Sequence, residues 1–169
     1  MAELGGDFPE ELFYAWGGRS TRQILELLRD DRGLAVDDIE AAVRRKETFY
    51  LAMIHEAKPI EPVLQVARRL HGSAPLAVAS GGFRKYVELT LEAIGARGLF
   101  SAVICAEDTA RGKPFPDPFL EAARRLGVEP QECLVFEDSP LGVRAAEAAG
   151  MRSVFVPRTG FSRSGSRTM

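Results

Sequence analysis

From residue 75 onward, short apolar runs alternate with helical stretches, and this alternation limits the fold more than any other feature of the sequence. The expected strands cover residues 76–79, 102–106, 134–136 and 153–156. Strands that alternate with helical patterns of about 10–15 residues are typical of a parallel sheet covered by helices. We therefore predict an α/β fold for this part of the chain.

The helices between these strands have recognisable ends. In the stretch DPFLEAARRLG, Asp117 and Pro118 stand at the N-cap and first-turn positions, and Gly127 is placed to end the helix. One unit later the same arrangement recurs with Ser139, Pro140 and Gly150. The stretch FRKYVELTLEAIG has apolar residues at helical spacing before a glycine stop. Each strand is thus followed by a helix of ordinary length.

Residues 1–72 read as helices and turns without a convincing strand, which predicts a helical cap in front of the α/β core at 73–158. Ser20 and Gln23 have the spacing of a capping box at the start of TRQILELLRD, and a second helix is expected over about 38–56. The prolines of AKPIEP interrupt the helical pattern near the joint. Residues 159–169, rich in Gly, Ser and Arg, are expected to form a disordered tail.

The composition limits the classes of binding partner. The 22 basic and 24 acidic residues nearly balance, which argues against nucleic acid as the partner and favours a small molecule. No apolar run reaches the roughly 18 residues of a membrane span, so we expect no membrane partner and a cytoplasmic location. Cys105 and Cys133 lie in apolar runs without metal or redox spacing, which fits buried thiols in a reducing compartment.

The first candidate site is the stretch AVASGG. The carboxyl ends of parallel strands face one crevice, and Ser80 stands where the first predicted strand ends. Gly81 and Gly82 would let the backbone approach an anion closely before the next helix begins. Taken alone, a Ser-Gly-Gly turn is more often structural than functional.

Two further candidates follow later strands. Lys113 precedes Pro114, which favours an extended backbone and presents the ammonium from a stiff loop, although a solvated lysine explains the residue equally well. Glu137 and Asp138 end the next strand, where two adjacent carboxylates repel unless a cation joins them, and their hard oxygens suit Mg²⁺. The alternative is that Asp138 and Ser139 only cap the following helix.

The order of hydroxyl, lysine and acidic pair, each after a successive strand, resembles the haloacid dehalogenase (HAD) superfamily and its Rossmannoid fold. It is most similar to the branch with a helical cap that contains β-phosphoglucomutase and small sugar-phosphate phosphatases. The resemblance covers nearly the whole chain. It implies that Ser80 binds the transferring phosphoryl group, that Lys113 neutralises charge on phosphate and nucleophile, and that Glu137 and Asp138 help to hold Mg²⁺.

The resemblance also makes the cap a lid that selects substrate. Arg19, in GGRST, falls where the selecting loop would lie and would meet a second phosphate or sugar hydroxyls, although a solvated arginine is an equal explanation. The implied function is a magnesium-dependent phosphatase of a small phosphorylated metabolite such as a sugar phosphate. The alternatives are a phosphohexomutase, a non-catalytic protein that binds a phosphorylated ligand or a protein partner, and an unrelated α/β domain.

One family motif is absent. The nucleophile of the family is an aspartate in a D-x-D-G-T motif at the end of the first, central strand, and no two aspartates of this chain are separated by one residue. The aspartates are Asp7, Asp30, Asp31, Asp37, Asp38, Asp108, Asp117 and Asp138. We therefore expect a truncated chain that lacks this strand and is inactive as given. In the family that strand lies between those at 76–79 and 134–136, so we also consider self-association through the resulting gap.

Overall fold

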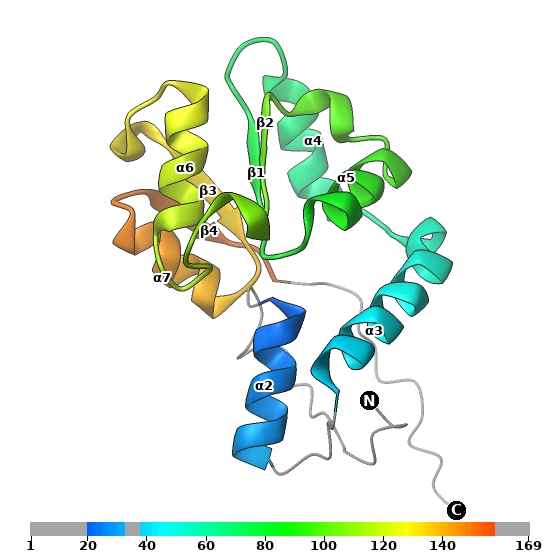
Figure 1. Cartoon of the computed structure of the whole chain (residues 1–169). Helices are drawn as coiled ribbons and strands as arrows, with labels where there is room; N and C mark the ends of the chain where they lie inside the picture. Colours follow the sequence, from blue (N-terminus) through cyan, green and yellow to red (C-terminus); the bar gives the residue numbers. More distant parts are fainter. Residues whose placement is uncertain (1–19, 33–37, 158–169) are drawn as a thin grey trace, which may run out of the picture.

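The computed structural model describes residues 20–32 and 38–157, which form alternating helices and strands (Figure 1). In chain order the elements are α2 (Thr21–Arg32), α3 (Ile39–Met53), η2 (Ile54–Glu56), α4 (Glu61–Leu70), β1 (Ala77–Ala79), α5 (Arg84–Ala93), η3 (Arg97–Leu99), β2 (Ala102–Ile104), η4 (Ala106–Asp108), α6 (Asp117–Leu126), η5 (Pro130–Glu132), β3 (Leu134–Glu137), α7 (Pro140–Ala148) and β4 (Arg152–Phe155), where η denotes a 3₁₀ helix. This order confirms the predicted α/β class.

The strands form two separate parallel pairs. β1 pairs with β2, with Ala77 opposite Ala102, and β3 pairs with β4, with Leu134 opposite Arg152. Among the described residues no strand joins the two pairs. The sheet is therefore divided between β1 and β3, the two strands that the sequence analysis expects to be separated.

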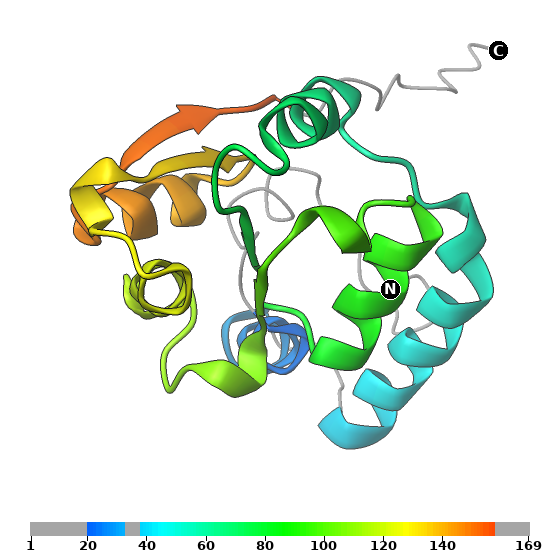
Figure 2. The same cartoon turned by 90° about the horizontal axis from the view of Figure 1, so that it is seen from above.

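Helices hold the two pairs together. α6 contacts both β1 and β2, α7 contacts both β3 and β4, and α6 contacts α7. Phe119 of α6 packs with Ala145 of α7 and with Met151 in one buried cluster. On the opposite side of β1 and β2, Leu64 of α4 and Leu91 of α5 form a second cluster. Figure 2 shows α5 and α6 on opposite sides of β1 and β2.

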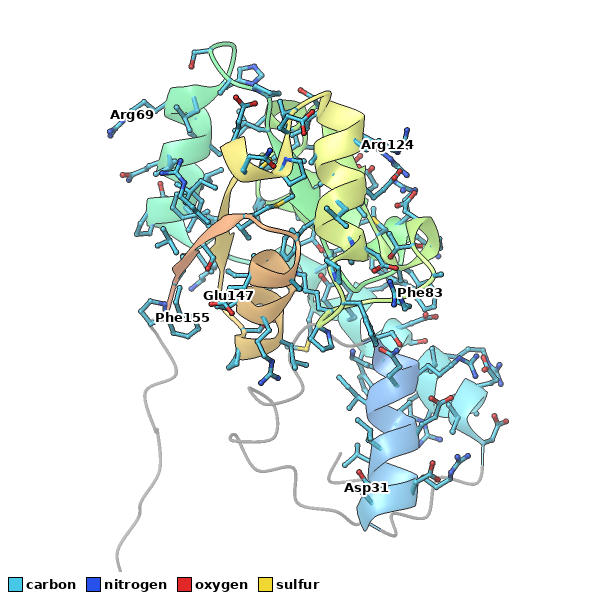
Figure 3. The ribbon with its side chains drawn as sticks, turned by 90° about the vertical axis from the view of Figure 1, so that its left-hand side faces the viewer. Asp31, Arg69, Phe83, Arg124, Glu147 and Phe155 are labelled. Carbon is cyan, nitrogen blue, oxygen red and sulfur yellow. The ribbon has the colours of Figure 1, made fainter. Side chains whose placement is uncertain are left out.

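The β3–β4 pair is covered on one face only. Side chains alternate along a strand, and Val135 packs against the cluster of α6 and α7 while its neighbours point the other way. Leu134 is 49% exposed, Phe136 37% and Val154 41%. Phe136 and Val154 are opposite each other in the register. An apolar face of this pair is thus open to solvent, and Phe155 at its end is also exposed (Figure 3).

Most predicted helix ends are confirmed. Ser20 N–H donates to Gln23 Oε1 at 3.0 Å and Gln23 N–H donates to Ser20 Oγ at 3.2 Å, which is the capping box. Gly127 ends α6 in the left-handed region with φ +68°. Ser139 Oγ accepts from Gly142 N–H at 3.0 Å at the start of α7.

The predicted N-cap of α6 is wrong. Pro116 is the N-cap residue, and it makes no side-chain cap bond. Asp117 is the first residue of the helix, and its carboxylate forms two hydrogen bonds with Arg111, at 3.0 and 2.9 Å. The bidentate contact with the guanidinium of Arg111 thus takes the place of the predicted cap bond.

The two cap helices have a small core of their own, in which Leu25 and Leu28 of α2 pack with Val43 of α3. α4 instead packs with the α/β part through Leu64. The boundaries at residues 72 and 158 stay predictions, and the predicted tail lies outside the described residues. No helix within the described ranges is long and apolar enough to cross a membrane.

Candidate active site

The turn after β1 presents several hydrogen-bond donors. Ser80 N–H continues the ladder by donating to Ile104 O at 2.9 Å, and Ser80 Oγ accepts from Gly82 N–H at 3.1 Å. Since the hydroxyl accepts this bond, its proton is free to donate to a ligand. The amides of Gly81 and Phe83 make no hydrogen bond within the part of the chain that the structure describes. The first amide of α5, Arg84 N–H, already donates to the Glu107 carboxylate at 2.9 and 3.1 Å. The donors left for an anion are therefore the Ser80 hydroxyl and the amides of Gly81 and Phe83.

Gly82 is closely packed in this turn. A Cβ at this position would lie 3.2 Å from Val87 Cγ2 and 3.4 Å from Ser80 Oγ. A side chain here would therefore press on Val87 and lie in contact with the Ser80 hydroxyl. The second glycine of the predicted motif thus has a steric explanation.

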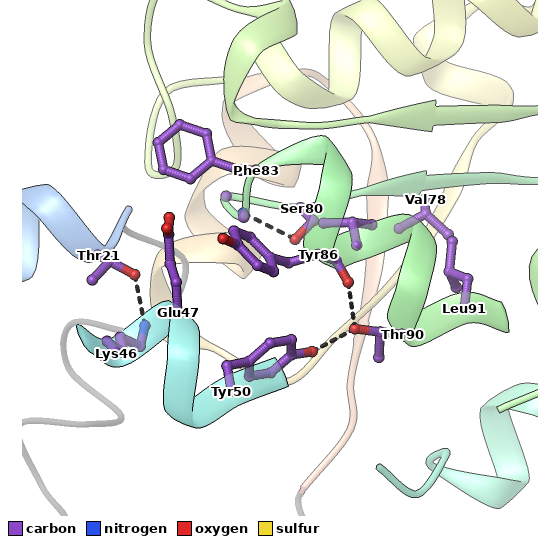
Figure 4. Close-up of a pocket in the computed structure, with 13 residues that line it drawn as sticks. Thr21, Lys46, Glu47, Tyr50, Val78, Ser80, Phe83, Tyr86, Thr90 and Leu91 are labelled. Carbon is purple, nitrogen blue, oxygen red and sulfur yellow. Dashed lines mark hydrogen bonds between the residues drawn. The ribbon is translucent and has the colours of Figure 1, made fainter. Parts of the chain in front are cut away.

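The turn opens into a pocket of about 370 Å³ between the cap helices and α5 (Figure 4). Its lining combines the turn, one face of α5 and the facing side of α3. The lining residues are Thr21, Lys46, Glu47, Tyr50, Val78, Ser80, Gly81, Gly82, Phe83, Tyr86, Val87, Thr90 and Leu91. The cap helices therefore form one side of the pocket that contains the predicted phosphate-binding turn.

A pair of tyrosines connects the cap to the core at this pocket. The Tyr50 hydroxyl of α3 and the Thr90 hydroxyl of α5 form a hydrogen bond. The rings of Tyr50 and Tyr86 meet edge to face, with centroids 6.0 Å apart and an interplanar angle of 89°. Within the cap, Lys46 Nζ of α3 donates to Thr21 Oγ1 of α2 at 2.6 Å. The two tyrosine contacts fix one edge of the cap against α5.

Lys113 and Glu137 form a buried ion pair. Their side chains are 7% and 6% exposed, and Lys113 Nζ donates to Glu137 Oε1. Glu137 Oε2 accepts from Ser139 N–H at 2.8 Å and from Ser139 Oγ at 3.0 Å. Burial works to raise the pKa of Glu137, but the Lys113 charge and these hydrogen bonds outweigh it and hold the pKa below its ordinary value.

The ion pair also explains a glycine in α7. A Cβ on Gly142 would lie 2.0 Å from the Glu137 carboxyl group, so no larger residue fits beside it. The Lys113–Pro114 peptide bond on the other side of the pair is cis. The pair joins the loop after β2 to the end of β3 and therefore connects the two halves of the divided sheet.

The acidic pair fits a magnesium ion only in part. Carboxylate oxygens are the right donors, but Mg²⁺ needs near-octahedral coordination. Both oxygens of Glu137 are already engaged, by Lys113 and by Ser139, while Asp138 is half-buried. Within the described ranges no three His, Cys, Asp or Glu residues come together as a metal site. A magnesium ion at this acidic pair would thus have to share the Glu137 oxygens with Lys113 and Ser139.

The predicted site residues fall into two groups. Ser80, Gly81 and Gly82 line the pocket. Lys113 and Glu137 pair with each other at the ends of later strands, and no hydrogen bond among the described residues joins them to Ser80. Arg19 lies outside the described residues.

Sequence reasoning missed the residues that the cap and α5 contribute to the pocket. Lys46 and Tyr50 are four residues apart on α3, and Tyr86 and Thr90 are four apart on α5, so each pair lies on one helix face. This spacing was available as a signal. It did not indicate that the two faces meet.

The family model for haloacid dehalogenase-like hydrolases matches residues 3–150 of the chain. The chain belongs to the haloacid dehalogenase-like hydrolases. Among curated relatives, fructose-1-phosphate phosphatase YqaB of Escherichia coli K12 is 32% identical over 156 residues, which cover 92% of this chain and 82% of that protein. An uncharacterized protein of Haemophilus influenzae is 30% identical over 157 residues, covering 93% and 78%.

Solved HAD structures confirm the predicted fold. CbbY from Rhodobacter sphaeroides, in complex with phosphate, is 28% identical with a TM-score of 0.72, and the match covers 97% of this chain and 77% of that one. β-Phosphoglucomutase from Clostridium difficile, at 22% identity, has a TM-score of 0.77 and covers 93% and 73%. The predicted likeness to the capped β-phosphoglucomutase branch is thus confirmed.

Proposed function

We propose that this chain carries the phosphate-binding part of a magnesium-dependent phosphatase that acts on a small phosphorylated metabolite such as a sugar phosphate. The observation that carries the proposal is the Ser80–Gly82 turn, which lines a pocket that it shares with the cap helices. The relative named as a fructose-1-phosphate phosphatase supports the substrate class.

Each predicted residue has a proposed role. The Ser80 hydroxyl and the amides of the turn bind phosphate oxygens, and Lys113 neutralises charge that develops during transfer. Phosphoryl transfer depends mainly on positioning and on electrostatic stabilisation, so a buried lysine fixed by Glu137 suits this role. Arg19 remains a proposed contact from the cap to a second phosphate or to sugar hydroxyls.

Glu137 and Asp138 are the proposed magnesium ligands of this chain. When bound, the ion would neutralise phosphate charge. Oxygen ligands beyond these two carboxylates would be needed to complete its shell.

We further propose that the 169 residues alone bind phosphorylated ligands but release phosphate orders of magnitude more slowly than an enzyme with an aspartate nucleophile. The proposal is supported by the lack of any D-x-D pattern in the sequence. A phosphohexomutase with the same phosphate site is a close alternative. The apolar face and divided sheet favour a second candidate, a non-catalytic protein that binds another chain or a second copy of itself.

The test combines turnover with binding. Magnesium-dependent phosphate release is measured on a panel of sugar phosphates, with Asp138→Ala as the control, and inorganic phosphate binding is measured for wild type and Ser80→Ala. We expect phosphate binding that Ser80→Ala weakens and little turnover. Rapid turnover that Asp138→Ala abolishes would show that the chain holds a nucleophile after all. If Ser80→Ala leaves phosphate affinity unchanged, the proposal that this turn binds phosphate would be refuted.

The cellular setting is also a proposal. Balanced charge and two free cysteines, of which Cys105 is buried, are consistent with a cytoplasmic protein. Burial raises the pKa of the Cys105 thiol to about 11, so the thiol stays protonated and unreactive.

A further inference from the structure

The pocket beside the phosphate-binding turn has an aromatic wall. Phe83 and Tyr86 of the α5 segment and Tyr50 of α3 line it together with apolar side chains such as Val87. Figure 4 shows the Tyr86 ring between Ser80 and Tyr50. A ligand whose phosphate lies at the turn therefore places its organic part against aromatic carbon.

Hydrogen bonds hold this wall in place before any ligand binds. The Tyr50 hydroxyl bonds to Thr90, whose Oγ1 also donates to the backbone carbonyl of Tyr86 at 2.6 Å. The Tyr86 side chain itself bonds to Glu47 of α3. The edge-to-face contact fixes the Tyr50 ring relative to the Tyr86 ring. A preformed flat surface costs little conformational entropy when a rigid ligand packs on it.

The charged groups of the pocket lie on α3, where Lys46 and Glu47 belong to the lining. They can bond to hydroxyl groups of a ligand, whereas the tyrosine hydroxyls of the wall already bond to Thr90 and Glu47. An open-chain polyol buried there would lose water from hydroxyls that find no replacement. A ring presents an apolar face of C–H groups or a π-face to the wall and keeps its polar groups at the edge.

We infer that this pocket selects phosphomonoesters whose organic part is a ring over open-chain phosphomonoesters of equal charge, and that Tyr86 and Tyr50 determine the selection. The inference rests on the proposed function, because it places the phosphate at the Ser80 turn. A volume of about 370 Å³ is enough for a small ring with its phosphate.

The test compares two hexose-derived ligands that differ in ring closure. Affinities of inorganic phosphate, glucose 6-phosphate and sorbitol 6-phosphate are measured by titration calorimetry, which requires no turnover. We expect wild type to bind glucose 6-phosphate about tenfold more tightly than sorbitol 6-phosphate. Tyr86→Leu keeps an apolar side chain but removes the ring, and it should reduce this preference to about twofold.

Two further variants serve as a second test of the aromatic wall and as a control. Tyr50→Leu changes the wall from the cap side and should also reduce the preference, so the test does not depend on Tyr86→Leu folding well. Phe155→Leu is the matched control, since Phe155 is 54% exposed on β4, well away from Phe83 in Figure 3, and it should keep the full preference.

The outcomes separate the two proposals. Phosphate binding that depends on Ser80, together with equal affinity for the two hexose-derived ligands, would overturn the ring selection and leave the proposed function standing. A preference that both tyrosine variants retain would likewise overturn the role of the wall. No phosphate binding by wild type would overturn both.

Discussion

At the scale of single residues, the buried ion pair has the largest effect on stability. Lys113 and Glu137 are both almost fully buried, and the described structure gives each charge the other as its partner. A buried pair adds little over apolar residues of equal size, but removing one partner leaves an uncompensated buried charge. The two residues should therefore behave as a unit in mutagenesis.

We predict that Lys113→Ala lowers the free energy of unfolding by about 3 kcal/mol, because Glu137 stays buried without its counter-charge. Urea denaturation of wild type, Lys113→Ala, Glu137→Gln and the double variant measures the coupling. The double variant should lose less than the sum of the single variants. Additive losses would show that the two side chains do not interact in solution.

The same ion pair predicts that the free energy of unfolding depends on pH. The pKa of Glu137 is lower in the folded protein than in the unfolded chain, so its contribution is present above about pH 4.3 and is lost as the pH falls through the folded value. Comparing wild type with Glu137→Gln cancels the other carboxyl groups. The stability advantage of wild type should be constant near neutral pH and shrink in acid. An advantage that grows on acidification would contradict the lowered pKa.

At the scale of elements, the glycine that ends α6 offers a clear prediction. Gly127 has φ +68°, where a β-carbon is unfavourable, so Gly127→Ala should lower the free energy of unfolding by about 1 kcal/mol. Gly98 in η3 is the matched control, because its φ is not positive and a Cβ there would meet nothing within 4 Å. Thermal denaturation of both alanine variants measures the difference. Equal losses would show that the left-handed conformation is not the cause.

Element boundaries could largely be predicted because local rules determine them. The capping box at Ser20, the glycine stop and the cap at Ser139 each depend on residues within four positions along the chain. The prediction that Asp117 is the N-cap of α6 was wrong because Arg111 contacts its carboxylate from the preceding loop. Its position depends on how that loop folds, which local sequence does not determine.

The pocket also depends on contacts that local sequence does not determine, here between residues farther apart in the chain. Each motif could be located from its strand end, but Tyr50 and Tyr86 are separated by 36 positions and meet only when the cap packs on α5. The pairing of Lys113 with Glu137 across 24 positions also depends on tertiary packing. Sequence indicated the chemistry of the turn, whereas the wall that faces it required the structure.

At the scale of the whole molecule, the divided sheet is the feature that most affects association with other chains. β1 and β3 each pair on one edge only within the described residues, and Phe136 and Val154 lie on an uncovered apolar face. Unpaired strand edges and exposed apolar surface favour association with another chain. This is the physical basis for the proposed self-association.

We predict that the purified chain shows an increase in mass with concentration, measured by sedimentation or light scattering. Phe136→Lys should reduce the association, because it places a charge on the open face of β3. Leu120→Lys is the control, since Leu120 is 40% exposed on α6 and lies on a different element. A monomer at all concentrations, or equal effects of both variants, would argue against association through this face.

The Lys113–Glu137 pair has an evolutionary consequence. Because it connects the two halves of the sheet, selection for folding alone can preserve both residues after catalysis is lost. A lineage that abandons phosphate chemistry would then still carry two residues that resemble those of an enzyme. Ser80 and its neighbouring glycines, which line the pocket and take no part in this ion pair, are the better indicators of whether descendants still bind a ligand.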